Sequence, residues 1–456
     1  MDPCTATLRR SPKVTGTPPD VVCLGESMVT FLPTRPGRLA DVPSFDRAIG
    51  GAESNVACAL AAAGYRTKWV GRVGCDGFGD HLTEAIGAHG VDVSAVVRDP
   101  ARPTGVYFRT AADRAADGHE VVYYRAGSAA SAMSPGTVPY GMLADARVLH
   151  LSGITAALSD SCLALVRALT ARDGWPGPAG RPLVSFDVNF RPGLWPDAAA
   201  GGEVLLELAR GADLVFVGAD EAETAWGVGD PHAIRAALPE PAVLVVKRGG
   251  EGATVFERGI ASPGGGPAGT GAAVGTGAPG SGDGADDAGA AVGTGAPGSG
   301  DGTDDAGAVG AADGEGPVPR GAVAPARGGL APRDSVAPAR GGLAPRDTVA
   351  PARGGLSPRD TVTHVPAPRV DVVAAVGAGD AFAAGFLAGT LRGLGVAARV
   401  RHGHLTAAAA LTVPGDLAVP VGRARADRLV ALDDEAWGTL HLGPGWTGDD
   451  QEVRTP

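Results

Sequence analysis

The residues best suited to chemistry lie near the C-terminal end of the chain, where positions 376–386 read VGAGDAFAAGF. Gly377 and Gly379 allow the backbone to turn tightly and leave its N–H groups accessible. An apolar, helix-forming run follows, so these N–H groups would open a helix, where unpaired donors and the helix dipole attract anions. A carboxylate at that place is useful if it takes a proton from a hydroxyl that attacks a phosphate. The segment therefore predicts phosphoryl transfer with Asp380 as the base.

A second glycine-rich segment, GGAESNVA, occupies positions 50–57. A glycine pair before a helix start lets a ligand approach backbone N–H groups closely. Asn55 can both donate and accept hydrogen bonds toward sugar hydroxyls. An ordinary turn with a helix cap explains the same residues about equally well, so the segment alone does not choose between the two.

A third segment, TGVYFR at positions 104–109, carries Tyr107 and Arg109. On a strand these two side chains share one face, because side chains alternate with a period of two. A hydroxyl and a guanidinium fork could bind a carboxylate or a hydroxyl-rich ligand. Without further context, a solvated sheet face is the favoured interpretation.

Three polar residues, Asp187, Asn189 and Arg191, follow an apolar run that reads as a strand. Alternation would place them on one side, at the carboxyl end of the strand, where ligands of α/β proteins bind. Polar groups are costly to bury unless they are satisfied. These groups could form hydrogen bonds with one another in a structural network or with a bound ligand. We favour the ligand site.

A further glycine-rich turn, KRGGEG, begins at Lys247 and ends at Gly252. It could pass close to the phosphates of an adenosine nucleotide, and a plain hairpin turn is the alternative. Glu221, which follows an expected strand, could hold Mg²⁺ through water. His402 and His404 have no carboxylate or cysteine at metal-ligand spacing, so we interpret them as residues of a helix surface or core.

The elements that must position these residues alternate along the chain. β-rich runs are expected at 21–24, 68–73, 121–124, 148–151, 183–187, 214–217, 243–246 and 364–373, and helices at 54–63, 80–89 and 161–171. Strands that alternate with helices indicate an α/β fold with a mostly parallel sheet. Residues 106–109 and 120–124 look like strands of a smaller antiparallel element.

Composition divides the chain into five parts. Residues 1–19 read as a disordered tail, 20–257 and 363–437 as the two parts of one folded domain, and 438–456 as a C-terminal tail. Between the two folded parts, residues 258–362 are of low complexity and contain internal repeats. This insertion has too few large apolar residues to offset chain entropy, so we expect it to be disordered.

Charge and hydropathy exclude several functions. The net charge of −11 argues against general nucleic-acid binding. The N-terminus has no apolar core of the kind a signal peptide needs, and no apolar run reaches the length of about 18 residues that a membrane span requires. We therefore expect a cytoplasmic protein without nucleic-acid or membrane partners.

The motifs together resemble the ribokinase-like (PfkB) carbohydrate kinases, over residues 21–256 and 364–416. Within that family the chain most resembles the 2-keto-3-deoxygluconate kinases, on the segments Gly25-Glu26, TGVYFR (104–109), YYRAGSAAS (123–131), DVNFRPGLW (187–195) and VPGD (413–416). The resemblance implies an α/β, ribokinase-like fold. A central, mostly parallel sheet would be flanked by helices, and strands near 29–48 and 104–125 would form a small antiparallel β lid.

The resemblance also implies a role for each segment. Asp380 would be the base, and the backbone of Gly377, Ala378 and Gly379 would form the anion hole. The sugar acid would be bound by Gly50, Gly51, Ala52, Glu53, Ser54, Tyr107, Arg109, Arg191 and Asp416. ATP would lie along Asn189, Arg191, Lys247, Arg248, Gly249, Gly250, Glu251 and Gly252 and along the catalytic turn from Gly377 to Asp380. Mg²⁺ would accompany ATP, with Glu221 as its ligand through water.

The expected function is ATP-dependent phosphorylation of 2-dehydro-3-deoxy-D-gluconate to its 6-phosphate. A fructokinase or ribokinase acting on a neutral sugar is the first alternative. A sugar- and ATP-binding pseudokinase is the second, because Ala374-Ala375 stand where the family has Asp-Thr, and Gly218 stands where it has Asn. The expected partner is a small sugar or sugar acid, and the lid offers a surface through which two copies could form a homodimer.

Overall fold

The structure of the protein is a computed structural model that describes residues 17–110, 120–175, 177, 180–258 and 360–448. All of these residues belong to one compact unit of the chain. Nearly all of the predicted N-terminal tail and insertion, and the last eight residues, lie outside the described residues, so the disorder expected there stays a prediction. Among the described residues, no helix combines the length and apolar character needed to cross a bilayer.

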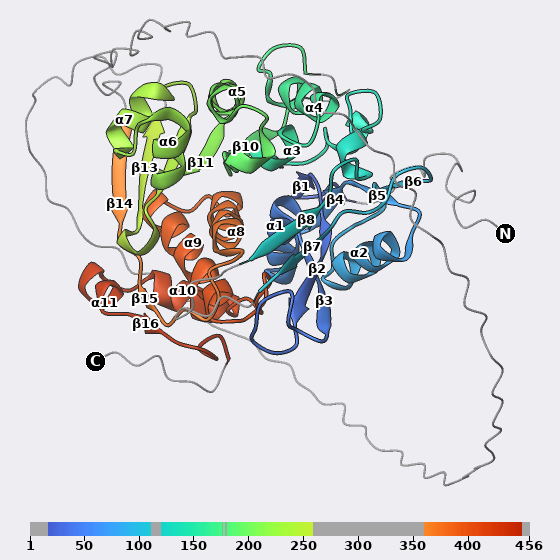
Figure 1. Cartoon of the computed structure of the whole chain (residues 1–456). Coiled ribbons are helices and arrows are strands. Elements are labelled where there is room, and N and C mark those ends of the chain that lie inside the picture. Colours follow the sequence, from blue (N-terminus) through green and yellow to red (C-terminus); the bar gives the residue numbers. More distant parts are fainter. Residues whose placement is uncertain (1–16, 111–119, 176, 178–179, 259–359, 449–456) are drawn as a thin grey trace, which may run out of the picture. The chain divides into compact units, whose positions relative to one another are not determined.

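The centre of the fold is an eight-stranded sheet (Figure 1). In spatial order its strands are β14 (Asp360–Val365), β13 (Ala253–Arg258), β12 (Val243–Lys247), β11 (Leu214–Gly218), β10 (Leu183–Asp187), β9 (Val148–Ser152), β1 (Val21–Leu24) and β4 (Thr67–Val70). The six strands from β12 to β4 are parallel, while β13 and β14 add an antiparallel edge. The predicted mostly parallel α/β sheet is confirmed.

Helices cover both faces of this sheet (Figure 1). The α-helices of the described residues are α1 (Ala52–Ala62), α2 (Gly77–Ala88), α3 (Gly153–Ala156), α4 (Asp160–Thr170), α5 (Ala198–Gly211), α6 (Ala219–Trp226), α7 (Pro231–Ala237), α8 (Ala378–Leu391), α9 (Val396–Leu411), α10 (Arg423–Val430) and α11 (Asp434–Gly438). Along β1, Val21 and Cys23 pack into one hydrophobic cluster, and Val22 and Leu24 into another. Both faces of the strand are therefore buried, which explains its uninterrupted apolar sequence.

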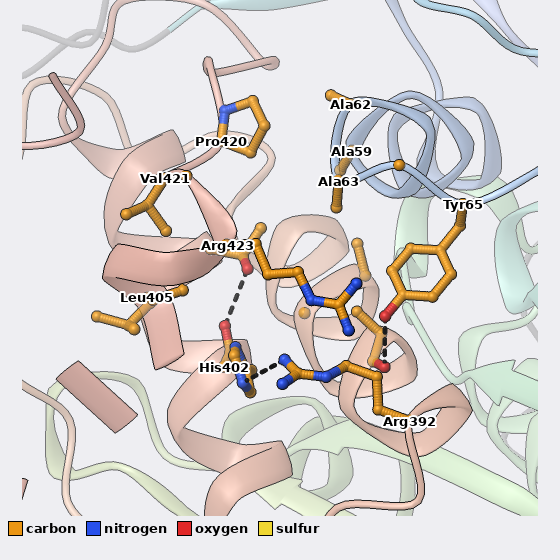
Figure 2. A pocket seen from close by; sticks show the side chains of 17 residues that line it. Ala59, Ala62, Ala63, Tyr65, Arg392, His402, Leu405, Pro420, Val421 and Arg423 are labelled. Atoms are coloured by element: carbon orange, nitrogen blue, oxygen red, sulfur yellow. Dashed lines mark hydrogen bonds between the residues drawn. The ribbon is translucent and has the colours of Figure 1, made fainter. Parts of the chain in front are cut away.

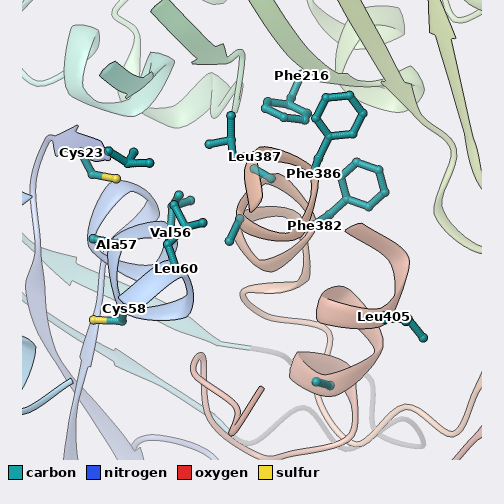
Figure 3. Packing of buried hydrophobic residues seen from close by; sticks show 14 of the residues in the cluster. Cys23, Val56, Ala57, Cys58, Leu60, Phe216, Phe382, Phe386, Leu387 and Leu405 are labelled. Atoms are coloured by element: carbon teal, nitrogen blue, oxygen red, sulfur yellow. The ribbon is translucent and has the colours of Figure 1, made fainter. Parts of the chain in front are cut away.

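Aromatic packing fixes α8 against the sheet (Figure 3). The ring of Phe216 on β11 meets Phe386 edge-on, with centroids 5.4 Å apart, and meets Phe382 at 6.3 Å. Phe382 and Phe386 are one helical turn apart, so they lie on the same face of α8. Edge-to-face pairs of this kind contribute about 0.5–1.5 kcal/mol each beyond their buried area. They hold the start of α8 near the carboxyl ends of the parallel strands.

A separate four-stranded sheet forms the predicted lid. Its order is β3 (Phe45–Gly50), β2 (Met28–Pro33), β7 (Val106–Arg109) and β8 (Val121–Tyr124). The outer pairs are antiparallel, as expected, while the central pair β2–β7 is parallel. Two short parallel pairs complete the strands, namely β5 (Arg72–Gly74) with β6 (Val97–Asp99), and β15 (Arg369–Val370) with β16 (His441–Leu442).

Several predicted boundaries need correction. The strand expected at 364–373 is two strands, because Pro366 and Pro368 lack the N–H group that a ladder needs. The run at 68–73 is likewise divided between β4 and β5. The insertion was expected to end at residue 362, but β14 already begins at Asp360. The C-terminal tail was expected from residue 438, yet β16 pairs with β15 beyond that point, and Trp446 is buried.

Candidate active site

Two neighbouring cavities lie at the carboxyl ends of the central parallel strands. The smaller, which we call the polar cavity, has a volume of about 330 Å³. Its lining includes Glu26, Gly50, Gly51, Ala52, Asn55, Tyr107, Tyr123, Arg125, Asp187, Asn189, Arg191, Glu221, Lys247, Ala375, Gly377, Gly379, Asp380 and Asp416. This is the edge of an α/β sheet where ligands bind, and most of the predicted site residues meet there.

The larger cavity, which we call the apolar cavity, has a volume of about 780 Å³. Its lining includes Lys247, Gly249, Gly250, Gly252, Ala367, Pro368, Arg369, Val370, Val372, Val373, Ala375, Ala378, Gly379, Phe382, His404 and Leu411. Lys247, Ala375 and Gly379 line both cavities. A group passed from one cavity to the other would therefore cross at these three residues.

The predicted catalytic turn, at the junction of the two cavities, depends on a glycine. Gly377 is the N-cap of α8 and has φ 77°, in the left-handed region that favours glycine. A Cβ atom at this position would come within 2.6 Å of the Asp416 backbone oxygen. The first-turn N–H groups of Ala378 and Gly379 have no acceptor within the helix, as in any helix start. Such free N–H groups can accept an anion, and Gly379 lines both cavities, so the predicted anion hole would lie where the cavities meet.

Asp380 is positioned by a residue from the other end of the chain. Asn55 Nδ2, on α1, donates to Asp380 Oδ2 at 2.9 Å. Burial raises the pKa of Asp380 to about 7, against the lowering effect of the Asn55 hydrogen bond. The negative charge of Asp187 raises it further, and the Lys247 ammonium lowers it. A carboxyl group with a pKa near neutrality is suited to act as a general base.

Lys247 connects two strand ends through Asp187. Its Nζ donates to both carboxylate oxygens of Asp187, at 3.0 and 3.2 Å, across the intervening strand β11. Burial alone would lower the pKa of Lys247, but the nearby carboxylates of Asp187, Glu221 and Asp380 outweigh it and raise the pKa. The ammonium group therefore stays charged at the point where the cavities meet, ready to bind an anionic group.

Two amide oxygens face the polar cavity without a protein partner. Asn189 has φ 42°, the one positive value found for a non-glycine residue among those described, and asparagine is among the residues that tolerate it best. Its Oδ1 atom and that of Asn55 are buried and accept no hydrogen bond from the described residues. Both residues line the polar cavity, so hydroxyl groups of a ligand could reach these acceptors.

Arg125 is a cation of the polar cavity for which no role was predicted from the sequence. It follows β8, its side chain is 10% exposed, and it forms an ion pair with the buried carboxylate of Glu26. Glu26 also accepts a hydrogen bond of 2.8 Å from Ser128 Oγ. Tyr123 and Arg125 both line the cavity, so the alternation of strand side chains was the signal that could have identified Arg125.

Arg109, by contrast, lies behind the cavity wall. Its guanidinium is 2.7 Å from Asp416 Oδ1, and its side chain is 2% exposed. Tyr107 Oη donates to the other carboxylate oxygen of Asp416 at 3.0 Å. Tyr107 and Asp416 line the polar cavity, whereas Arg109 does not. The structure therefore gives Arg109 a contact that holds Asp416 in place.

Two residues of the early glycine-rich segment also point elsewhere. Glu53 is fully buried, and its Oε1 atom accepts hydrogen bonds of 2.7 Å from Ser152 and Thr155. Burial raises the pKa of this carboxyl group. Ser54 Oγ donates to Ser27 Oγ at 3.0 Å. From this segment, the polar cavity is lined by Gly50, Gly51, Ala52 and Asn55.

Some of the predicted ATP-binding residues line a cavity and others do not. Lys247, Gly249, Gly250 and Gly252 line the apolar cavity, whereas Arg248 and Glu251 form an ion pair with each other and line neither cavity. The opposite wall, residues 367–373, was not expected to bind a ligand. Its residues are mostly apolar, and such a wall has no sequence signal that separates it from a hydrophobic core.

Glu221, the expected Mg²⁺ ligand, lines the polar cavity. Its Oε2 atom accepts from the Gly218 N–H at 2.9 Å, and its Oε1 atom lies 3.4 Å from Arg191 NH1. No group of three or more acidic, histidine or cysteine side chains suited to a metal ion exists among the described residues. Mg²⁺ commonly uses one or two carboxylates together with water and substrate phosphates, so a single carboxylate here fits the ion.

Comparison with known proteins places this geometry in a family. The sequence pattern of the pfkB family carbohydrate kinases matches residues 18–288 and 355–420. The chain is 37% identical to a 2-dehydro-3-deoxygluconokinase of Thermoproteus tenax over 52% of this chain and 72% of the relative. It is also 37% identical to that of Bacillus subtilis (47% and 65%), and 29% identical to a probable chloroplastic fructokinase-6 of Arabidopsis thaliana (53% and 62%).

Solved structures agree in fold. A PfkB protein from Polaromonas is 26% identical, with a TM-score of 0.58 over 88% of this chain and 98% of that one. A sugar kinase of Pyrococcus horikoshii, solved in complex with ATP, is 18% identical, with a TM-score of 0.59 over 91% and 98%. Because the family pattern matches most of its length, the chain belongs to the pfkB family of carbohydrate kinases.

Proposed function

We propose that the protein transfers the terminal phosphoryl group of ATP to the 6-hydroxyl group of 2-dehydro-3-deoxy-D-gluconate. The observation that carries this proposal is the polar cavity, whose lining combines arginine side chains with a carboxyl group whose pKa is about 7. Two relatives at 37% identity bear the name of this activity. The sugar acid would occupy the polar cavity, and the nucleotide would occupy the apolar cavity beside it.

The residues where the polar and apolar cavities meet would have separate roles in the reaction. Asp380 would accept the proton of the attacking hydroxyl, while Asn55 holds its carboxylate in position. The N–H groups at the start of α8 would stabilise the charge of the phosphoryl group in transit, which is usually the largest contribution in such reactions. Lys247, which touches both cavities, would neutralise phosphate charge at the crossing point.

The choice of a sugar acid rests on positive charge. Arg125 lines the polar cavity with its side chain almost buried, and Arg191 lies at the exposed rim. A guanidinium group binds a carboxylate through two parallel hydrogen bonds, which a neutral sugar cannot supply. The amide oxygens of Asn55 and Asn189 would accept hydrogen bonds from the hydroxyl groups of the sugar.

ATP and Mg²⁺ fit the remaining features. The glycines at 249, 250 and 252 leave room for phosphates beside the apolar cavity, and its apolar wall suits a nucleobase. When bound, Mg²⁺ would neutralise phosphate charge, and Glu221 would hold it through water. Because ATP is the proposed phosphoryl donor, we also propose that the protein works in the cytoplasm.

Steady-state kinetics with a panel of acceptors test the proposal. We expect kcat/KM for 2-dehydro-3-deoxy-D-gluconate to exceed the values for fructose and ribose by at least about tenfold, as one charged hydrogen bond can provide. The Asp380→Asn variant supplies the background rate. A preference for fructose or ribose would contradict the choice of substrate and favour a neutral-sugar kinase. Binding of sugar and ATP without turnover would favour a pseudokinase.

We further propose that two copies associate through the lid. Its surface carries stacked aromatic rings, with Phe31 and Phe108 4.8 Å apart and Tyr124 edge-on to Phe108 at 6.0 Å. Tyr124, on the edge strand β8, is 65% exposed. Analytical ultracentrifugation would test this proposal: the wild-type protein should sediment as a dimer and the Tyr124→Glu variant as a monomer. A monomeric wild type would contradict it.

A further inference from the structure

A third cavity, which we call the helix cavity, lies among α1, α8, α9 and the start of α10 (Figure 2). Its volume is about 280 Å³, near the lower end of the usual range for small-molecule sites, which begins at about 300 Å³. One part of its wall is built from small residues of α1, its C-cap and α8, namely Ala59, Ala62, Ala63, Ala384, Gly385 and Ala388. The proposed kinase reaction uses none of them.

Two arginines of this cavity have different surroundings. Arg392 binds Asp427 through two contacts of 2.7 and 3.0 Å and lies 3.2 Å from His402 Nε2. Arg423 lines the same cavity but forms no hydrogen bond or ion pair with any other described residue. Figure 2 shows its guanidinium group extending toward Tyr65 and Arg392.

The cavity therefore carries an excess of positive charge. The charged side chains that line it are the two guanidinium groups, while the carboxylate of Asp427, which pairs with Arg392, is not part of the lining. His402 adds no charge near neutral pH, because burial and the neighbouring Arg392 lower its pKa. The N-terminus of α10, at Gly422 and Arg423, adds the positive end of a helix dipole. An anion would find a favourable potential here.

We propose that the helix cavity binds a small organic anion, a carboxylate or phosphate ester with a short carbon skeleton, and that this ligand modulates the kinase reaction. Carboxylate and phosphate oxygens both match the two-pronged donor geometry of the Arg423 guanidinium. The alanine wall opposite would cover the carbon skeleton of the ligand. The inference goes beyond the proposed function, since binding at this cavity requires no sugar.

The cavity is connected to the active site through two helices. Ala59 lies four residues after Asn55 on α1, and Ala384 lies four residues after Asp380 on α8, so each pair shares a helix face. A small hollow of about 20 Å³, lined by Asn55 and Ala59 among others, separates the two places. An anion held between α1 and α8 would change the spacing of the helices that carry the 2.9 Å hydrogen bond between Asn55 and Asp380.

Calorimetric titration of the full chain tests the binding. The protein would first be saturated with Mg²⁺ and a non-hydrolysable ATP analogue, so that the anion hole is filled. The probes are inorganic phosphate, glycerol 3-phosphate and pyruvate, with glycerol as the neutral control. Arg423→Gln removes the charge, and Ala62→Leu narrows the cavity from an exposed helix position. Arg428→Gln, at an exposed position of the same helix, is the matched control.

We expect at least one anionic probe to bind at one site per chain, and glycerol not to bind. Affinity should fall at least about tenfold in Arg423→Gln, as expected for a charged hydrogen bond, should also fall in Ala62→Leu, and should not change in Arg428→Gln. The same probe should change kcat of the wild type but not of Arg423→Gln. Absence of binding by every probe, or equal affinity in Arg423→Gln, would overturn the proposal. An inactive enzyme that still binds the probe would contradict the kinase proposal alone.

Discussion

The Arg109 guanidinium lies 2.7 Å from the Asp416 carboxylate, and both side chains are almost completely buried, with exposed fractions of 2% and 4%. Arg109 belongs to the lid strand β7, while the backbone of Asp416 lies against the glycine of the catalytic turn. This ion pair therefore connects the lid to the turn that begins α8. The role of Arg109 in the reaction is expected to be indirect.

Replacing Arg109 should lower the stability and the activity of the enzyme without changing its preference for acidic over neutral sugars. Arg109→Met leaves the Asp416 carboxylate buried without its cation, which typically costs about 3–5 kcal/mol of unfolding free energy. We expect that loss in urea titration, together with an equal fractional fall of kcat/KM for acidic and neutral sugars. Arg47→Met, at an exposed position of the lid, should change stability by less than about 0.5 kcal/mol. A loss confined to the acidic sugar would instead mean that Arg109 binds substrate directly.

Arg125 should control the preference for an acidic sugar. We expect Arg125→Met to raise KM for 2-dehydro-3-deoxy-D-gluconate at least about tenfold, since a charged hydrogen bond is lost, with little change in KM for fructose. Because this change leaves the buried Glu26 unpaired, the Glu26→Gln/Arg125→Met double variant separates recognition from stability. It should recover stability in urea titration and keep the raised KM. An equal effect on both sugars would assign Arg125 a structural role.

The pH dependence of the reaction should follow Asp380. The pKa of about 7 means that the carboxyl group ionises over the neutral range, and only the ionised form can accept a proton. We expect kcat/KM to rise with pH up to about 7 and then to level off. Asp380→Asn should lower kcat by about 10²–10⁴-fold, the usual contribution of a general base. A wild-type profile that is flat between pH 5 and 8 would contradict this assignment.

The same carboxyl group should limit stability at high pH. Its pKa in the folded protein exceeds the unfolded value of 3.8, so the folded state holds the proton more tightly. Its contribution to stability is therefore present below pH 4 and is lost as the pH rises to about 7. Thermal unfolding should show that Asp380→Asn raises Tm more at pH 8 than at pH 5. An equal effect at both pH values would mean that the pKa is not raised.

Removing the Lys247 charge should move the pH profile upward. The ammonium group lowers the pKa of Asp380, and its loss also frees the charge of Asp187, which raises that pKa. In Lys247→Met the inflection of kcat/KM should therefore appear at a higher pH than in the wild type. Lys68→Met is the matched control, because Lys68 is also buried and paired, with Asp92 at 3.1 Å, but lines neither cavity. A shift in both variants would show that the effect is not local.

The turn at Gly377 should tolerate no side chain. Gly377→Ala would combine an unfavourable φ with a contact of 2.6 Å to the Asp416 backbone oxygen. Gly393→Ala is the matched control, since its φ is 69° but a Cβ atom there meets nothing within 4 Å. In both variants, backbone strain should lower the free energy of unfolding by about 1–2 kcal/mol. Only Gly377→Ala should lose more than that and also lose kcat, by about 10²–10³-fold, as when an anion-hole donor is displaced.

Local sequence was enough to predict the glycine turn that begins α8 and the parallel sheet. The turn is a property of consecutive residues, since Gly377, Gly379 and Asp380 need only their own backbone and the helix that follows. The strands were identifiable because burial on both faces leaves continuous apolar runs, as in β1. The two prolines at 366 and 368 are the sequence signal that divides β14 from β15, although a single strand was expected across them.

Long-range pairing was not predictable in the same way. Alternation places Tyr107 and Arg109 on one face, but the partner that covers Arg109 lies 307 residues away. Asn55 and Asp380 are separated by 325 residues, and no spacing rule connects them. The apolar wall at 367–373 was missed for a different reason, because its side chains have the same chemistry as the core.

The edge of the large sheet has a consequence for the evolution of this chain. Strands β13 and β14 pair antiparallel, with Arg258 opposite Asp360, and Asp360 is anchored by a buried ion pair of 2.8 Å with Arg235. The two ends of the intervening segment are thus fixed side by side, as in a hairpin. Since the free-energy cost of loop closure rises by only about 0.6 kcal/mol for each doubling of loop length, this junction can accept a much longer connection at a modest cost in stability. An insertion at this junction can therefore change in length and sequence during evolution without moving the residues of the candidate active site.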